Sequence, residues 1–121
     1  MVKNAIILFS HGARDPRWKE PIINVQKLIQ AQNPEVIVEL AFLELMSPTL
    51  SECIEEIISK EIYQMTLVPI FFGQGGHIRE DLPKLLAACS QKYPQMDLTV
   101  KPAVGEDLGV LQAIAKYCTD Q

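Results

Sequence analysis

The sequence contains few of the features that stabilise secreted or membrane proteins. Three cysteines, Cys53, Cys89 and Cys118, are odd in number and include no Cys-x-x-Cys pair, so no disulfide framework is expected. No apolar run approaches the roughly 20 residues that span a bilayer, and no signal segment with a small-residue cleavage site is recognisable. These absences predict a cytoplasmic protein whose cysteines are reduced and packed in its core.

Positive charge is also scarce. The chain has 11 lysines and arginines against 15 acidic residues, a net charge of -4, and this disfavours general nucleic-acid binding, which needs a basic face. The lysines are scattered, whereas the three arginines, Arg14, Arg17 and Arg79, lie in only two segments. A guanidinium group binds carboxylate or phosphate through two hydrogen bonds. The clustering therefore favours a site for an anionic small molecule, with solvated loop arginines as the alternative.

The apolar residues alternate between strand and helix periodicity. At 121 residues, we expect one domain covering 1–121. The predicted strands are 4–9, 36–45, 64–72 and 97–104, each followed by a helix, and the last helix covers 107–118. Four such units predict an α/β fold, a single lobe with a four-stranded parallel sheet and helices on both faces. Strands with a continuous apolar run are expected at the centre of the sheet. The fourth strand, in which apolar and polar residues alternate, is expected at an edge. Together these positions predict the strand order 2-1-3-4.

Three local features can be predicted within this scheme. Ser47-Pro48 has the composition of a helix start, a hydroxyl cap followed by proline at the first position. Pro83 is expected in the first turn of the third helix, where proline is tolerated. Trp18 shares helical spacing with Ile22 and Ile29, and this predicts a buried face on the first helix.

Histidine occurs only twice, and the two positions are alike. His11 in "LFSHGARDPRW" follows the first strand, and His77 in "PIFFGQGGHIRED" follows the third. In the order 2-1-3-4 the connections change direction between these two strands, and ligands bind beyond the carboxyl ends of strands at such a point. A single histidine at a strand end is more often an ordinary loop residue, but the pair favours a shared site.

Glu44 ends the predicted second strand, next to the first, so it can reach the same crevice. Two imidazoles and a carboxylate suit divalent Fe, Co, Ni or Zn, although a solvated strand-end carboxylate is the alternative. The glycines at 73, 75 and 76 permit close approach of backbone to a ligand. They are not a dinucleotide fingerprint, because Ile78 occupies the place of the third glycine.

Three segments together resemble a known family. "ILFSHGARDPRW", "FLELMSPTL" and "VPIFFGQGGHIREDLP" are similar, in order and spacing, to the short form of the sirohydrochlorin cobaltochelatase/ferrochelatase family, the type II chelatases. The resemblance implies insertion of a divalent metal, Co²⁺, Fe²⁺ or Ni²⁺, into sirohydrochlorin during cobalamin or sirohaem biosynthesis. It also implies a homodimer with no permanently bound cofactor, the metal being a substrate.

The resemblance assigns roles to particular residues. His11 and His77 match the metal-handling and catalytic histidines, and Glu44 matches the assisting acid. The rim of sirohydrochlorin carries carboxylates, which are suitable partners for arginine. The expected substrate-binding residues are Arg14, Arg17, Arg79, Ser10, Gly75 and Gly76.

Three alternatives stay open at this point. A non-catalytic metal or tetrapyrrole carrier would use the same residues in the same crevice. A histidine phosphatase also has His-Gly after its first strand, but that chemistry needs arginine immediately before the histidine, where Ser10 stands. The third alternative is an interaction module whose loop residues only cap strands.

Overall fold

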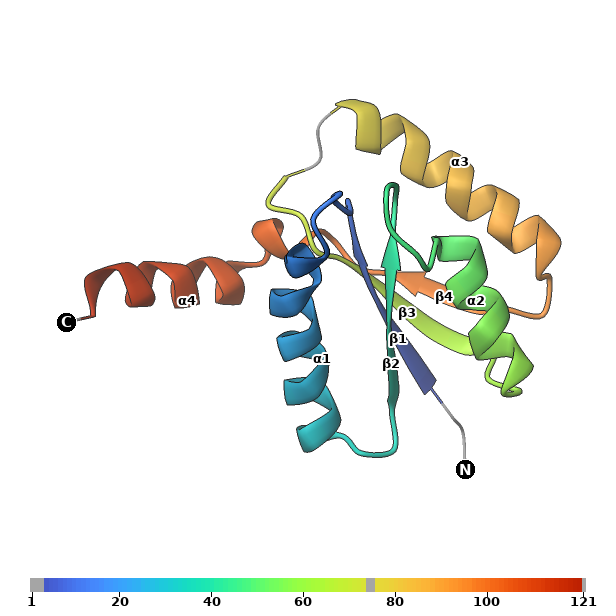
Figure 1. Ribbon diagram of the computed structural model, residues 1–121, viewed down its shortest axis with the longest axis horizontal. Helices are drawn as coiled ribbons and strands as arrows, with labels where there is room; N and C mark the ends of the chain where they lie inside the picture. Colours follow the sequence, from blue (N-terminus) through green and yellow to red (C-terminus); the bar gives the residue numbers. More distant parts are fainter. Residues whose placement is uncertain (1–3, 74–75, 121) are drawn as a thin grey trace.

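A parallel sheet forms the centre of the protein. The computed structural model describes residues 4–73 and 76–120, without the side chains of 76–78. The four strands are β1 (Asn4–Ser10), β2 (Ile37–Phe42), β3 (Gln64–Pro69) and β4 (Asp97–Val100). All neighbouring strands are parallel and their order is β2-β1-β3-β4, which confirms the predicted topology (Figure 1).

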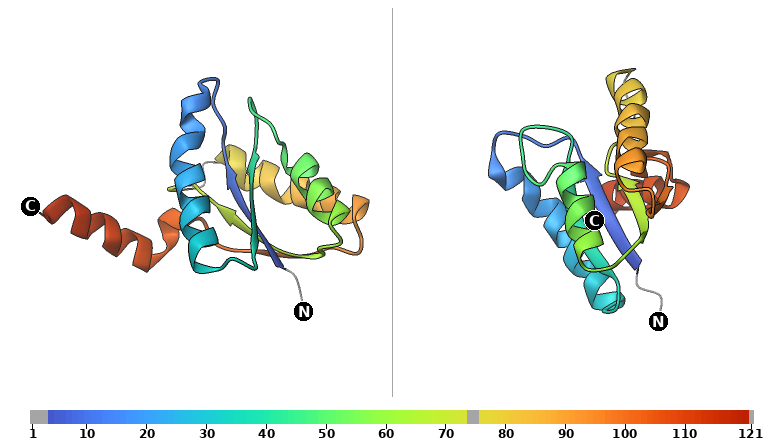
Figure 2. Two further views of the ribbon diagram at one scale, coloured as in Figure 1. Left: turned by 60° about the horizontal axis from the view of Figure 1, so that its bottom comes forward. Right: turned by 90° about the vertical axis from the view of Figure 1, so that its right-hand side faces the viewer.

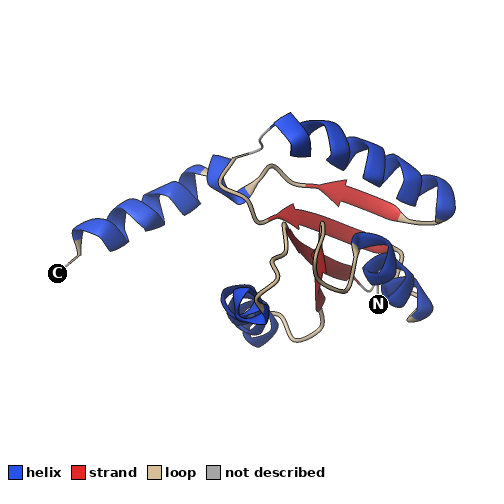
Figure 3. Cartoon of the chain, turned by 45° about the horizontal axis from the view of Figure 1, so that its top comes forward, coloured by secondary structure: helices blue, strands red, loops and turns tan. Residues whose placement is uncertain are grey.

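Helices cover both faces of this sheet, as predicted. The helices are α1 (Glu20–Gln32), α2 (Leu50–Ser59), α3 (Gly76–Lys92) and α4 (Leu108–Thr119), with short 3-10 helices η1 (Pro16–Lys19) and η2 (Val104–Glu106). In Figure 3, α1 lies on one side of the strands and α2 and α3 on the other, while α4 extends away from them. None of the helices in the described part of the chain combines the length and apolar character needed to cross a bilayer.

The main core lies between the sheet and the helices α2 and α3. Ile7, Phe9 and Leu67 have no exposed area and alternate with residues that face α1, as the pleat of a strand requires. Ile54 and Ile57 of α2 are also completely buried against them. This packing supports β1 and β3 just before the residues at which the two strands end.

The predicted start of α2 was two residues early. Thr49, not Ser47, is the N-cap: its hydroxyl accepts from the backbone N–H of Glu52, whose carboxylate accepts in return from the Thr49 N–H. This reciprocal pair satisfies two of the N–H groups that a helix start leaves unpaired. The Ser47-Pro48 segment belongs to the loop before the cap.

The predicted bounds of all four strands differ from those in the structure. The first strand extends one residue further, to Ser10, and the fourth ends at Val100 instead of 104, since residues 104–106 form η2. The second strand ends at Phe42 instead of 45, because the chain turns at Leu45, whose φ of 67° is incompatible with extended backbone. The third strand ends at Pro69 instead of 72. α3 begins at Gly76, so Pro83 lies inside the helix and not in its first turn. There it lacks the N–H that would bond to the carbonyl of Arg79.

The predictions of core position were wrong for Trp18 and Cys118. Trp18 is 67% exposed because it lies in η1, where a 3-10 turn capped by Asp15 puts its side chain out of phase with α1. Cys118 is exposed on α4, whereas Cys53 and Cys89 are buried as predicted.

The packing of α2 leads to a first prediction. Replacing Ile54 by alanine should lower the free energy of unfolding by about 2–5 kcal/mol, because a completely buried isoleucine leaves a cavity when truncated. Glu55→Ala, one residue along on the exposed side of the same helix, is the matched control and should change it by about 0.5 kcal/mol or less. Urea denaturation measures both, and equal losses would contradict the described packing.

Candidate functional site

The backbone pairing between β1 and β2 continues past the ends of both strands. The last strand pair is Ser10 with Phe42. Beyond it, the N–H of Leu43 donates to the carbonyl of Ser10 at 2.9 Å, and the N–H of Glu44 donates to the carbonyl of His11 at 3.0 Å. The structure therefore brings His11 and Glu44 together at the carboxyl edge of the sheet. Glu44 lies two residues past its strand, where its side chain is exposed to solvent.

Gly12 makes this approach possible. Its φ is +92°, and a Cβ added to it would lie only 2.0 Å from the carbonyl oxygen of Glu44. Any side chain at this position would displace the β2–α2 loop from the β1–α1 loop. This role of Gly12 was not predicted from the sequence, although a glycine directly after His11 was a signal for it.

The imidazole of His11 packs against the aromatic core. Its ring centroid lies 4.6 Å from that of Phe71, and Phe71 in turn makes an edge-to-face contact with Phe9 at 6.0 Å. Phe71 is only 4% exposed, whereas His11 is exposed. One face of the imidazole is thus supported by the core, and the ring keeps access to solvent and to any ligand.

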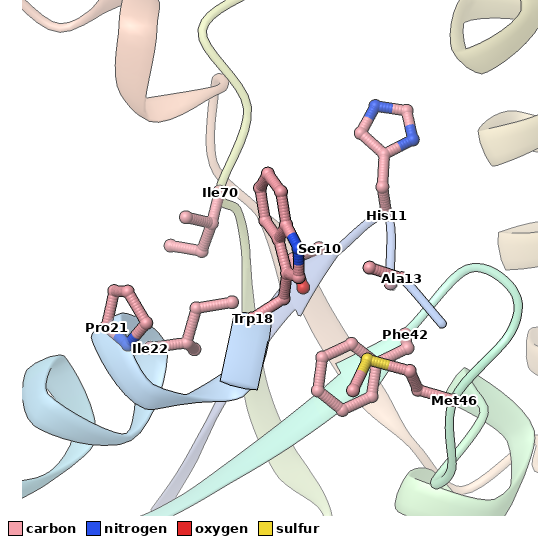
Figure 4. A pocket seen from close by; sticks show the side chains of 10 residues that line it. Ser10, His11, Ala13, Trp18, Pro21, Ile22, Phe42, Met46 and Ile70 are labelled. Carbon is pink, nitrogen blue, oxygen red and sulfur yellow. The ribbon is translucent and has the colours of Figure 1, made fainter. Parts of the chain in front are cut away.

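An apolar pocket of about 410 Å³ opens beside His11. The indole of Trp18, together with Phe42 and Met46, forms much of its wall; His11 also lines the pocket, but its imidazole points away from these side chains (Figure 4). Such a surface suits the face of a flat, largely apolar ligand. The remaining lining residues are Ser10, Gly12, Ala13, Pro21, Ile22 and Ile70.

Trp18 is thus a site residue that sequence analysis assigned to the core. The signal that could have placed it correctly is Asp15-Pro16 upstream of it, because an acidic cap followed by proline indicates a helical turn starting there. Ser10, predicted to bind substrate, does line the pocket and is 7% exposed.

Of the predicted site residues that follow β3, the structure describes only a part. The backbone of His77 lies in the first turn of α3 and not in a loop, and its side chain lies outside the described part of the structure. Gly76 opens that helix, and Gly75 lies outside the described residues. α3 begins at the same end of the molecule at which β1 ends (Figure 1). Without the His77 side chain, the described residues form no group of three or more metal-ligating side chains.

The three arginines differ in their surroundings. Arg17 donates to both carboxylate oxygens of Asp15, with its NH2 group 2.7 Å from Oδ2. These hydrogen bonds hold the pKa of Asp15 below its ordinary value and raise the pKa of Arg17. Arg14 and Arg79 are exposed, Arg14 in the β1–α1 loop and Arg79 near the start of α3. Arg14 and Arg79 are therefore the better placed to meet an anionic ligand.

Comparison with known proteins settles the family. A family model described as CbiX matches residues 5–121. The chain belongs to the CbiX family. Among CbiX relatives, the sirohydrochlorin cobaltochelatase of Saccharolobus solfataricus is 29% identical over 113 residues, 92% of this chain and 87% of that protein. The sirohydrochlorin cobaltochelatase of Methanococcus aeolicus is 33% identical over 82 residues, which cover 68% of this chain but only 57% of the relative.

Solved structures share the fold of this CbiX chain. The CbiX protein of Marinobacter aquaeolei VT8 superposes with a TM-score of 0.83 at 23% identity, over 95% of this chain and 93% of its own. The sirohydrochlorin chelatase SirB from Bacillus subtilis, solved in complex with cobalt, gives a TM-score of 0.81 at 24% identity. That alignment covers 98% of this chain and 51% of SirB, so the chain spans about half of SirB.

The close approach at Gly12 leads to a second prediction. Gly12→Ala should destabilise the protein by about 1–3 kcal/mol, because alanine strains both the positive φ and the contact with Glu44. It should also shift the imidazole NMR signals of His11. Gly73→Ala is the matched control, since an added Cβ there meets nothing within 4 Å. Unchanged His11 signals in Gly12→Ala would contradict the described role of Gly12.

Proposed function

We propose that the chain is a sirohydrochlorin metal chelatase, which inserts Co²⁺, Fe²⁺ or Ni²⁺ into sirohydrochlorin on the route to cobalamin or sirohaem. The observation that carries the proposal is the position of His11, held beside Glu44 by backbone pairing and at the rim of an apolar pocket. Membership of the CbiX family supports the same activity.

The reaction requires two proton transfers and one metal transfer. The incoming ion must lose water, two pyrrole N–H groups must lose their protons, and the ion must then enter the ring. A neutral imidazole can ligate a divalent ion and can also accept a proton. We assign these steps to His11 and His77, and the second proton to Glu44. The macrocycle gains one divalent ion and loses two protons, so its net charge is unchanged.

The pocket and the arginines supply the binding surface for the macrocycle. Trp18, Phe42 and Met46 present apolar area to its flat face. Arg14 and Arg79 bind its peripheral carboxylates, with Arg17 contributing less because Asp15 already occupies its guanidinium group. In this proposal no cofactor is permanently bound, because the metal enters as one substrate and leaves within the product.

We further propose that the active form is a cytoplasmic homodimer. A single four-stranded lobe contacts one face of a flat macrocycle, and the SirB chain is about twice as long as the part that this chain matches. A second copy would supply the second wall, and two-fold pairing is the commonest way in which identical chains associate.

The direct test is anaerobic incubation with sirohydrochlorin and Co²⁺ or Fe²⁺, followed by the absorbance change on metallation. We expect many metal ions inserted per protein chain, at a rate well above the uncatalysed background. Binding of both ligands with at most one metallation per chain would instead identify a carrier. Hydrolysis of a generic aryl phosphate, with no metallation, would identify a phosphatase.

The different surroundings of the arginines lead to a third prediction. Arg14→Ala and Arg79→Ala should each weaken sirohydrochlorin binding about tenfold or more, the loss of a hydrogen bond to a charged group being worth about 1.5–3 kcal/mol. Metal binding should change far less. Arg17→Ala should have a smaller effect, and Lys27→Ala on α1 is the control for removing an exposed positive charge. Titration calorimetry measures both ligands, and equal losses of metal and sirohydrochlorin binding would contradict the assignment.

A further inference from the structure

One lysine lies directly beside the apolar pocket. Lys19 is the last residue of η1, and its neighbours Trp18 and Pro21 both line the pocket. The ammonium nitrogen of Lys19 lies 5.5 Å from the centre of the Phe42 ring, which forms part of the pocket wall. The positive charge of Lys19 is therefore placed at the border of the pocket, next to its apolar lining.

The side chain of Lys19 connects two segments that are distant in the sequence. Both views of Figure 2 show the start of α1 and the β2–α2 loop at the same end of the molecule. The Lys19 ammonium joins them by donating to the backbone carbonyl of Ser47 at 3.4 Å. This hydrogen bond and the contact with the Phe42 ring restrict the side chain before any ligand arrives. Less conformational entropy is then lost when the lysine binds a ligand.

No carboxylate neutralises the charge of Lys19 in the part of the chain that the structure describes. The lysine that forms ion pairs there is Lys60, with Glu39 and Glu56. A carbonyl group and an aromatic ring offer Lys19 only partial negative charge. An ammonium group has three N–H donors, of which Ser47 accepts one. Lys19 therefore keeps the capacity to bind an anion.

The helix that follows Lys19 gives no structural reason for a positive charge at this position. α1 begins at Glu20, and the side chain of Lys19 makes no capping hydrogen bond to it. The amino end of a helix carries partial positive charge, which disfavours lysine, and Ser, Thr, Asp or Asn is preferred before the first turn. A ligand explains a lysine at this position better than the fold does.

The chemistry of this border fits a flat macrocycle with carboxylates around its rim. When the face of the macrocycle covers the apolar lining, its rim reaches the border at which Lys19 lies. Arg14 belongs to the β1–α1 loop and Arg79 to α3, so neither is held by the β2–α2 loop as Lys19 is. Beside an apolar wall, the attraction between an ammonium and a carboxylate is screened less than in open water.

We propose that Lys19 is a substrate-binding residue that binds one peripheral carboxylate of sirohydrochlorin, with the Ser47 carbonyl and the Phe42 ring holding its ammonium group in place beforehand. This inference rests on the proposed function, because sirohydrochlorin is the ligand in both. Lys19 contacts the rim of the macrocycle and not the metal, so it contributes to binding and not to metal transfer.

The first test is the dissociation constant of sirohydrochlorin under anaerobic conditions, measured by the fluorescence of Trp18, the single tryptophan of the chain. Lys19→Met removes the charge but keeps an unbranched apolar side chain. At low salt the dissociation constant should rise about fivefold or more, the upper end of the range for an exposed ion pair. Lys19→Arg keeps the charge and should restore most of the affinity. Lys92→Met is the matched control and should leave the constant unchanged, since Lys92 also lies over an aromatic ring, that of Tyr93 at 5.4 Å, but at the end of α3.

The salt dependence of binding separates a charge effect from a packing effect. Raising the salt from about 0.05 M to about 0.5 M shortens the screening length from roughly 14 Å to roughly 4 Å. The difference in affinity between wild type and Lys19→Met should therefore shrink to about twofold or less. An equal loss at both salt concentrations would show that Lys19 only packs on Phe42, and this would overturn the proposal. Wild-type affinity of Lys19→Met at low salt would also overturn it.

Steady-state metallation distinguishes this inference from the proposed function. In Lys19→Met the KM for sirohydrochlorin should rise while kcat changes little, as for a group that binds the substrate and the transition state alike. Wild-type KM and affinity in Lys19→Met would overturn the role of Lys19 and leave the chelatase function in place. A salt-sensitive loss of affinity, in a protein whose wild type shows no turnover, would overturn the chelatase function alone. A wild type that binds no sirohydrochlorin would overturn both.

Discussion

The site depends on one backbone hydrogen bond, from the N–H of Glu44 to the carbonyl of His11. Parallel strands pair only while both chains stay extended, and their connections normally diverge at the carboxyl edge. Here the pairing of β1 with β2 persists for two residues past that edge, and Gly12 leaves the space for it. His11, the proposed metal ligand, and Glu44 are thereby held together by main-chain geometry, which costs little flexibility in the side chains that are proposed to do the chemistry.

The core and the site are connected through aromatic rings. Phe9 of β1 is buried in the core between the sheet and the helices α2 and α3. Phe71 packs on Phe9, and the imidazole of His11 packs on Phe71. The apolar pocket lies around Trp18, on the side of β1 that faces α1. The rigid core thus supports one face of the imidazole, while the exposed indole offers area to a ligand at small conformational cost. This arrangement of a supported imidazole and an exposed indole suits a protein that binds a flat macrocycle and exchanges metal ions with solvent.

Much of this arrangement could be predicted from the sequence, because strand order follows from which apolar runs are continuous and which alternate. That order alone placed His11 next to Glu44. The strand ends were predicted too late because residues 43–45 and 70–72 continue the apolar pattern while the backbone changes direction, as the positive φ of Leu45 shows. Trp18 was misplaced because periodicity cannot reveal a 3-10 turn that shifts the phase of a helix.

The central claim, that His11 handles the metal while contributing little to the fold, is tested most directly by measuring metallation and unfolding on the same preparations of His11→Ala. We predict that the rate with sirohydrochlorin and Co²⁺ falls by about 10²-fold or more, as for loss of an acid–base residue. The free energy of unfolding should fall by no more than about 1.5 kcal/mol, the value of an aromatic contact. A His11→Ala/His77→Ala double variant that metallates sirohydrochlorin at nearly the wild-type rate would contradict the account.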